Sequence, residues 1–135
     1  MTRRIQTAAL VFIGLIYSST ASLAQNLGWS TWKNENTSLL LITKVETGKI
    51  TGTFINNHPE FPACTGIAVP VRGTISGNDL VLVANFASCS NTMTVWKGML
   101  SGNGENIPMS WILHYVDQNG NFAELRGSNT FTKVH

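Results

Sequence analysis

Residues 30–42, STWKNENTSLLLI, decide the fold because two strand-like segments meet there across a short turn. Asn-Glu-Asn-Thr has the composition of a turn, and Ser-Leu-Leu-Leu-Ile after it begins a second strand. Such a hairpin places Asn34 and Ser38 opposite each other where the two strands end. An amide and a hydroxyl close to the apolar Trp32 raise the question of what these polar groups bind.

The same pattern continues along the rest of the chain. Helical periodicity is absent after the first 24 residues, and short runs of Val, Ile, Thr, Leu and aromatic residues alternate with Gly, Asn and Asp turns. The predicted strands are 29–34, 38–45, 50–57, 67–76, 80–87, 92–101, 107–116 and 122–134. The turn sequences are ETGK at 46–49, SGND at 76–79, SGNGEN at 101–106 and DQNG at 117–120, and the one long loop is HPEFPACTG at 58–66.

Eight strands joined by hairpins in about 110 residues predict one all-β domain, an antiparallel up-and-down β-barrel. Closure into a barrel removes the exposed edges that an open sheet would leave. An eight-stranded barrel either fills with side chains or holds one small ligand at its mouth. A flattened sandwich of two sheets is the structural alternative.

Alternation along two strands indicates which interior to expect. If Trp96 faces inward, Thr94 and Thr92 share its face, and an inward Phe54 brings Asn56 with it. A purely structural core would place aliphatic residues there, because a buried hydroxyl or amide without a partner costs about 1–3 kcal/mol. The pattern favours a polar, shaped cavity that binds a ligand. The alternative is that these hydroxyl and amide groups form hydrogen bonds with one another or with bound water.

The first 24 residues have the features of a signal peptide. Arg3 and Arg4 form a basic head, residues 8–17 are an apolar run, and residues 22–24, Ser-Leu-Ala, suit signal peptidase. The apolar run is shorter than the roughly 20 residues that span a bilayer. We therefore expect a secreted or periplasmic domain, residues 25–135, with no membrane attachment after cleavage; a retained anchor is the alternative.

Charge and cysteine content narrow the classes of partner. Of the nine Lys and Arg, Arg3 and Arg4 leave with the signal peptide, so seven remain against seven Asp and Glu. A neutral domain without a basic stripe is not expected to bind nucleic acid. Cys64 and Cys89 both lie in the exported part, where an isolated pair most simply forms one disulfide; two reduced thiols are the alternative.

No motif for catalysis or metal binding accompanies these features. His58, His114 and His135 have no second ligand at a spacing typical of metal sites. A nucleophile elbow, a glycine-rich phosphate loop and a carboxylate pair suited to acid-base chemistry are also missing from the sequence. The chain is therefore not expected to be an enzyme or to need a cofactor.

Five segments, in order, resemble the strand motifs of the avidin and streptavidin family of biotin-binding proteins. They are TWKN with Ser38, ITGTF at 50–54, TMTVWKG at 92–98, SWIL at 110–113 and GSNTFTKV at 127–134. A single piece such as TGT is weak evidence, but five in the right order over nearly the whole exported domain are specific. The resemblance implies a barrel that binds biotin without covalent chemistry, in order to sequester the vitamin.

The family's polar contacts carry over to positions of this chain. Asn34 and Ser38 match the groups that bind the ureido oxygen of biotin, and Asn56 and Asn129 match the acceptors of its two N–H groups. A urea offers one strong acceptor and two donors, so a site with donors and acceptors arranged in this way complements it. The matches for the rest of the ligand are Thr94 at the thioether sulfur, Thr92 at the carboxylate end, and Trp96, Trp111 and Phe86 as aromatic walls.

The chain departs from the family pattern at two places. Phe54 replaces a tyrosine whose hydroxyl also binds the ureido oxygen, and its loss could weaken binding by about 1–3 kcal/mol. Tetrameric members cover the ligand with a tryptophan from a neighbouring subunit, where this chain offers only Phe122. Cys64 and Cys89 instead resemble the dimeric bacterial, rhizavidin-like branch, in which a disulfide ties the loop after strand three to that after strand five. The resemblance thus implies a homodimer.

Two other functions fit a small secreted barrel. A protease inhibitor would insert its N-terminal segment, residues 25–28, into an enzyme and would have no need of inward Asn34, Thr92 and Thr94. A general carrier of small apolar ligands would have an apolar lumen.

Overall fold

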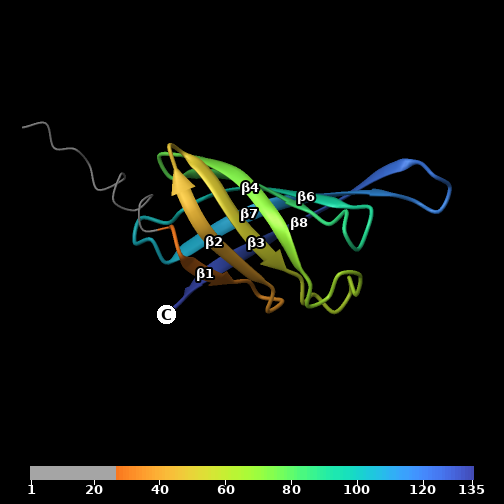
Figure 1. Ribbon diagram of the computed structural model, residues 1–135, viewed down its shortest axis with the longest axis horizontal. Coiled ribbons are helices and arrows are strands. Elements are labelled where there is room, and N and C mark those ends of the chain that lie inside the picture. Colours follow the sequence, from red (N-terminus) through yellow and green to blue (C-terminus); the bar gives the residue numbers. More distant parts are fainter. Residues whose placement is uncertain (1–26) are drawn as a thin grey trace, which may run out of the picture.

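The computed structural model describes residues 27–135, which form a closed barrel of eight antiparallel strands (Figure 1). Each strand pairs with the next one along the chain, and β1 pairs with β8 through Trp32 and Lys133. This last pairing leaves no open edge, so the predicted barrel is confirmed and the sandwich is wrong. The strands are β1 (Ser30–Lys33), β2 (Leu39–Glu46), β3 (Lys49–Ile55), β4 (Ala68–Ser76), β5 (Asp79–Asn85), β6 (Met93–Met99), β7 (Asn106–Val116) and β8 (Phe122–Val134), each within two residues of its predicted ends.

The connections differ in length between the two ends of the barrel. At one end β2–β3 and β4–β5 turn in two residues each, and Thr47 and Gly48 both have positive φ (51° and 73°), as a tight hairpin turn requires. The β6–β7 connection, residues 100–105, also lies at this end. The other end carries the connections of residues 34–38, 56–67, 86–92 and 117–121, which include the longest one, residues 56–67 (Figure 1). We call this end the mouth and the β3–β4 connection, residues 56–67, the lid loop.

The barrel interior changes from apolar to polar toward the mouth. Along β3 the inward side chain near the tight turns is Ile50, followed by Phe54 and, at the mouth, by the buried Asn56. On β6 the order from the mouth is Thr94 and then Trp96, both buried as expected. Buried apolar residues of the core include Leu40 and Val69, which pair with Phe54, together with Ile42, Val71, Leu80, Leu82, Leu100 and Ile107. The strands therefore hold a packed core at one end and leave space at the other.

Trp32 belongs to the packed part and has its own hydrogen-bond partner. It is fully buried, and its Nε1 donates to Ser30 Oγ at 2.8 Å. The Ser30 hydroxyl in turn donates to the backbone oxygen of Leu27. Asn34 and Ser38 are therefore not needed to satisfy Trp32.

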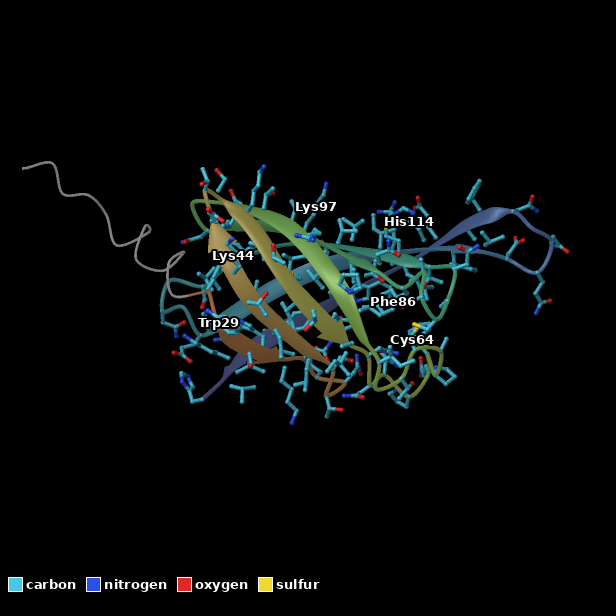
Figure 2. All side chains as sticks on the ribbon, viewed as in Figure 1. Trp29, Lys44, Cys64, Phe86, Lys97 and His114 are labelled. Carbon is cyan, nitrogen blue, oxygen red and sulfur yellow. A yellow bond between two sulfur atoms is a disulfide. The ribbon has the colours of Figure 1, made fainter. Side chains whose placement is uncertain are left out.

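The predicted disulfide between Cys64 and Cys89 is confirmed. It joins the lid loop to the β5–β6 connection, with a Cα–Cα distance of 5.5 Å, and Cys64 lies at the mouth end in Figure 2. The predicted signal peptide, residues 1–24, lies outside the described residues. Within residues 27–135 no helix is long and apolar enough to cross a membrane.

Candidate ligand-binding site

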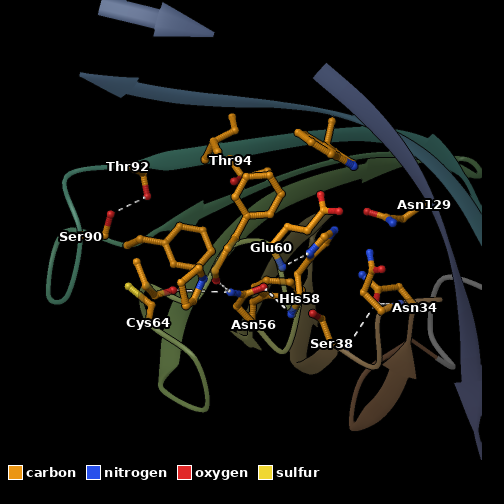
Figure 3. A pocket seen from close by; sticks show the side chains of 18 of the residues that line it. Asn34, Ser38, Asn56, His58, Glu60, Cys64, Ser90, Thr92, Thr94 and Asn129 are labelled. Atoms are coloured by element: carbon orange, nitrogen blue, oxygen red, sulfur yellow. Dashed lines mark hydrogen bonds between the residues drawn. The ribbon is translucent and has the colours of Figure 1, made fainter. Parts of the chain in front are cut away.

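A cavity of about 290 Å³ occupies the mouth half of the barrel (Figure 3). This volume is close to the lower end for small-molecule sites, about 300 Å³. Every ligand-contacting residue predicted from the sequence lines it, although these residues come from four strands (β3, β6, β7 and β8) and three connections (β1–β2, β3–β4 and β5–β6). They are Asn34, Ser38, Phe54, Asn56, Phe86, Thr92, Thr94, Trp96, Trp111 and Asn129.

Asn34 and Ser38 present hydrogen-bond donors to the cavity. Asn34 Oδ1 accepts the backbone N–H groups of Asn36 and Ser38, both at 3.0 Å, so the turn uses the oxygen of this amide. Ser38 Oγ accepts the N–H of Asn57 at 2.9 Å. The Asn34 Nδ2 group and the Ser38 hydroxyl hydrogen therefore remain for an acceptor in the cavity.

Asn129 on β8 presents its side-chain oxygen to the cavity, whereas Asn34 presents its N–H₂ group. Its Nδ2 donates to Glu35 Oε2 at 3.1 Å, which leaves its oxygen to accept a hydrogen bond. Burial acts to raise the pKa of the Glu35 carboxyl, but hydrogen bonds from the backbone N–H groups of Glu35 and Thr130 and from Asn129 outweigh it. The pKa of Glu35 is consequently lowered, which favours a carboxylate that can only accept.

Aromatic side chains form the apolar walls around Phe54. Its ring centroid lies 4.9 Å from that of Trp96 and 6.0 Å from that of Phe86, the latter in an edge-to-face arrangement. Phe131 packs against both Phe54 and Trp96 at 6.4 and 6.3 Å. These contacts exclude water from one side of the cavity and so strengthen hydrogen bonds made beside it.

Trp111 forms a further wall, and a glycine makes room for it. Gly127 is its direct partner on β8, and a Cβ atom there would lie 2.2 Å from Cζ2 of the indole. The ring therefore lies flat against the β8 backbone. Its Nε1 is buried and has no hydrogen-bond partner among the described residues, so an acceptor entering the cavity could satisfy it.

Asn56 anchors the lid loop as well as lining the cavity. Its Nδ2 donates to the backbone oxygen of Phe61 at 2.6 Å, and its Oδ1 accepts the N–H of His58 at 3.1 Å. One lone pair of Oδ1 is still available to a ligand. The Asn56 side chain thus couples the wall of the cavity to the loop that closes it.

Two hydroxyls lie together at the β5–β6 side of the mouth. Ser90 Oγ donates to Thr92 Oγ1 at 3.2 Å, and Thr94 follows Thr92 on the inward face of the strand (Figure 3). Sequence reasoning missed Ser90 because it lies in the connection before β6, although it stands two residues before Thr92. Leu113 was also missed, and its spacing of two from Trp111 on β7 was the signal that could have found it.

The remaining missed residues are Asn36, which lines the cavity, Glu35, which contacts Asn129, and individual side chains of the lid loop. His58, Phe61 and Cys64 line the cavity from the lid loop, and the His58 and Phe61 rings stack edge to face at 4.8 Å. Since polar groups surround part of the cavity, it is not the uniformly apolar lumen of a general carrier. Within residues 27–135, no three His, Cys, Asp or Glu side chains gather where they could hold a metal ion.

Comparisons with known proteins agree with this architecture. The avidin family model matches residues 22–134. Afifavidin from Afifella pfennigii is 30% identical over 112 residues, which cover 78% of this chain and 69% of that protein. The structure of a bradavidin2–biotin complex is 42% identical, with a TM-score of 0.74 over 80% of this chain and 98% of that one. A rhizavidin–biotin complex is 27% identical, with a TM-score of 0.70 over 78% of this chain and 92% of that one. The chain therefore belongs to the avidin family.

Proposed function

We propose that this protein binds biotin tightly and without catalysis inside its barrel. The observation that carries the proposal is the opposite orientation of two asparagines in one cavity. Asn34 offers an N–H donor because the turn uses its oxygen, and Asn129 offers an oxygen because Glu35 uses its nitrogen. A cyclic urea presents an oxygen and N–H groups side by side, and this arrangement complements both.

With the ureido oxygen at Asn34 and one ureido N–H at Asn129, the other lining residues contact the remaining parts of biotin. Ser38 donates to the ureido oxygen together with Asn34, and the free lone pair of Asn56 accepts the second N–H. Thr94 contacts the thioether sulfur, and Thr92, supported by Ser90, binds the carboxylate end. Trp96, Trp111, Phe86 and Phe54 enclose the ring system. None of these contacts requires a cofactor or a covalent step.

Retention on immobilised biotin tests the proposal. The oxidised domain, residues 25–135, should be retained on biotin-agarose and be released by free biotin. A double variant, Asn34→Ala with Ser38→Ala, removes both donors to the ureido oxygen and should be retained much less. Failure of the folded, disulfide-bonded parent to be retained would refute biotin binding.

Phe54→Tyr is expected to slow biotin release. A hydroxyl that reaches the ureido oxygen adds a third donor worth about 1–3 kcal/mol, or about five- to a hundred-and-fiftyfold in the dissociation rate. The measurement is displacement of a labelled biotin by excess free biotin. Phe122→Tyr makes the same chemical change on a side chain that is 95% exposed and should alter nothing. Equal release rates for Phe54→Tyr and the parent would show that the oxygen site does not lack a donor.

Gly127→Ala should weaken biotin binding by about tenfold, because the added methyl group displaces the Trp111 indole from the cavity wall. A titration monitored by tryptophan fluorescence measures both the affinity and the environment of the ring. Gly102→Ala is the matched control, since a Cβ atom there meets nothing within 4 Å. Unchanged affinity in Gly127→Ala would mean that Trp111 is not a wall of the binding site.

We further propose a homodimer that forms through the outer face of β5, β6 and β7. Val83, Val95 and Ile112 are adjacent in register across these strands and form an apolar row on the outside of the barrel. Met93 and Met99 extend this row on β6, with 39% and 56% of their surface exposed. Lys97 and His114 stand two residues after Val95 and Ile112 on their strands, so they border the row on the same outer face. An apolar face of this kind suits contact with a second copy.

Sedimentation equilibrium at micromolar concentration tests the dimer. The parent should have the mass of two chains, and Val95→Glu should yield a folded monomer because it places a charge in the apolar row. A monomeric parent would refute the dimer without affecting the biotin site.

We also propose that residues 1–24 are removed when the protein is exported to the periplasm or the medium. The Cys64–Cys89 disulfide supports this, because disulfides form in such oxidising compartments.

A further inference from the structure

We propose that Glu35 is a positioning residue that makes Asn129 an acceptor, and that the site thereby selects ligands with an N–H donor at this point. The Glu35 carboxylate holds Nδ2 of Asn129 away from the ligand, so that Oδ1 faces the cavity. Figure 3 shows the oxygen of Asn129 on the side of the other lining residues. This inference rests on the proposed biotin binding and deepens it.

Two hydrogen bonds from β8 hold the Glu35 carboxylate. Oε2 accepts from Asn129 Nδ2 at 3.1 Å, and Oε1 accepts from the backbone N–H of Thr130 at 2.6 Å. Glu35 lies in the turn between β1 and β2, and Asn129 and Thr130 lie on β8. The pairing of β1 with β8, which closes the barrel, brings these residues together although they are more than 90 positions apart in the chain.

The carboxylate matters because a side-chain amide is nearly symmetric in shape but not in function. A rotation by half a turn exchanges the N–H₂ and the oxygen of Asn129 with little change in packing. An ionised carboxylate can only accept, so the exchanged orientation would place two oxygens against each other. Glu35 therefore determines whether position 129 donates or accepts, as the turn amides do for Asn34.

Reversing the polarity of position 35 tests this role. Glu35→Lys presents only donors, so the Asn129 oxygen should turn toward the lysine and its N–H₂ should face the cavity. We expect biotin affinity to fall by at least about tenfold. Asn129→Asp alone should also weaken binding, because it places two carboxylates side by side.

The double variant, Glu35→Lys with Asn129→Asp, separates a positioning role from general damage. The lysine pairs with one carboxylate oxygen and the other faces the cavity as an acceptor, so affinity should return to within about threefold of the parent. Glu46→Lys makes the same charge change at the opposite end of the barrel and should bind as the parent does. Parent-like binding by Glu35→Lys, or a double variant at least as weak as the weaker single variant, would overturn the proposal.

The role of Glu35 can also be tested without biotin, by NMR of the Asn129 side-chain amide. The side-chain N–H₂ resonances of Asn129, identified by their loss in Asn129→Asp, should shift in Glu35→Ala and stay unchanged in Glu46→Ala. Unshifted resonances in Glu35→Ala would overturn the role of Glu35 even if biotin binds. Failure of the parent on biotin-agarose, with the shift present, would refute the ligand but not the oriented amide.

Discussion

Replacing Cys64 and Cys89 with alanine is expected to lower the free energy of unfolding by roughly 3–4 kcal/mol and to speed biotin release. The disulfide closes a loop between residues 25 positions apart, and this closure limits the freedom of the unfolded chain. It also ties the lid loop to the β5–β6 connection, which carries Phe86 and Ser90 of the cavity. Because the disulfide already holds the lid loop in its bound arrangement, less conformational entropy is lost when the ligand binds. Urea denaturation and displacement of labelled biotin measure the two effects.

A sample reduced under native conditions provides a second route to the same comparison, with thiol titration to verify that the bond is open. Ser88→Ala changes an exposed neighbour of Cys89 and controls for alterations in the β5–β6 connection. The expected result is parent-like stability and release for this control. If a verified reduced sample released biotin at the parent's rate, the disulfide would stabilise the fold but have no effect on ligand release.

Trp111→Ala is expected to weaken biotin binding by about 2–4 kcal/mol, or roughly thirty- to a thousandfold. The indole lines the cavity and lies flat on Gly127, so truncation removes a wall and admits water beside the polar groups. Calorimetric or fluorescence titration gives the affinity. A thermal melt of each variant establishes that the protein compared is folded.

Trp29→Ala is the matched control, because this tryptophan is 87% exposed and does not line the cavity. Its affinity should equal that of the parent. A loss of less than threefold in Trp111→Ala would contradict the proposed ligand orientation, since an aromatic wall in contact with the ring system cannot be removed at so small a cost.

Particular residues show why so much of the site could be predicted. Alternation along a strand placed Phe54 with Asn56 and Trp96 with Thr94 on one face, and the barrel has both pairs inside. The family resemblance added Asn129, whereas the Cys64–Cys89 disulfide followed from an isolated pair of cysteines in an exported domain. Local patterns sufficed there, because a strand's two faces and a turn's composition depend on residues close together in the chain.

Glu35 and Asn56 show where local patterns stop. In the sequence, Glu35 is indistinguishable from an ordinary turn residue. Only the pairing of β1 with β8 brings it to Asn129. Asn56 was predicted as a ligand acceptor, but the folded lid loop also makes it an anchor for Phe61 and His58. The contact of Glu35 with Asn129 has no fixed spacing in the sequence that a motif could express, and the contact of Asn56 with the Phe61 oxygen depends on the folded lid loop.

The sequence by itself determined the eight strands, their turns and the residue types that face inward. Strand alternation and turn chemistry act over a few residues, so these features can be read without the fold. Only the tertiary structure decided the direction in which Asn129 presents its amide, because that direction depends on Glu35, 94 positions away in the chain, whereas the local turn orients the amide of Asn34. A cavity that suits a urea therefore follows from closure of the barrel as much as from the residues that line it.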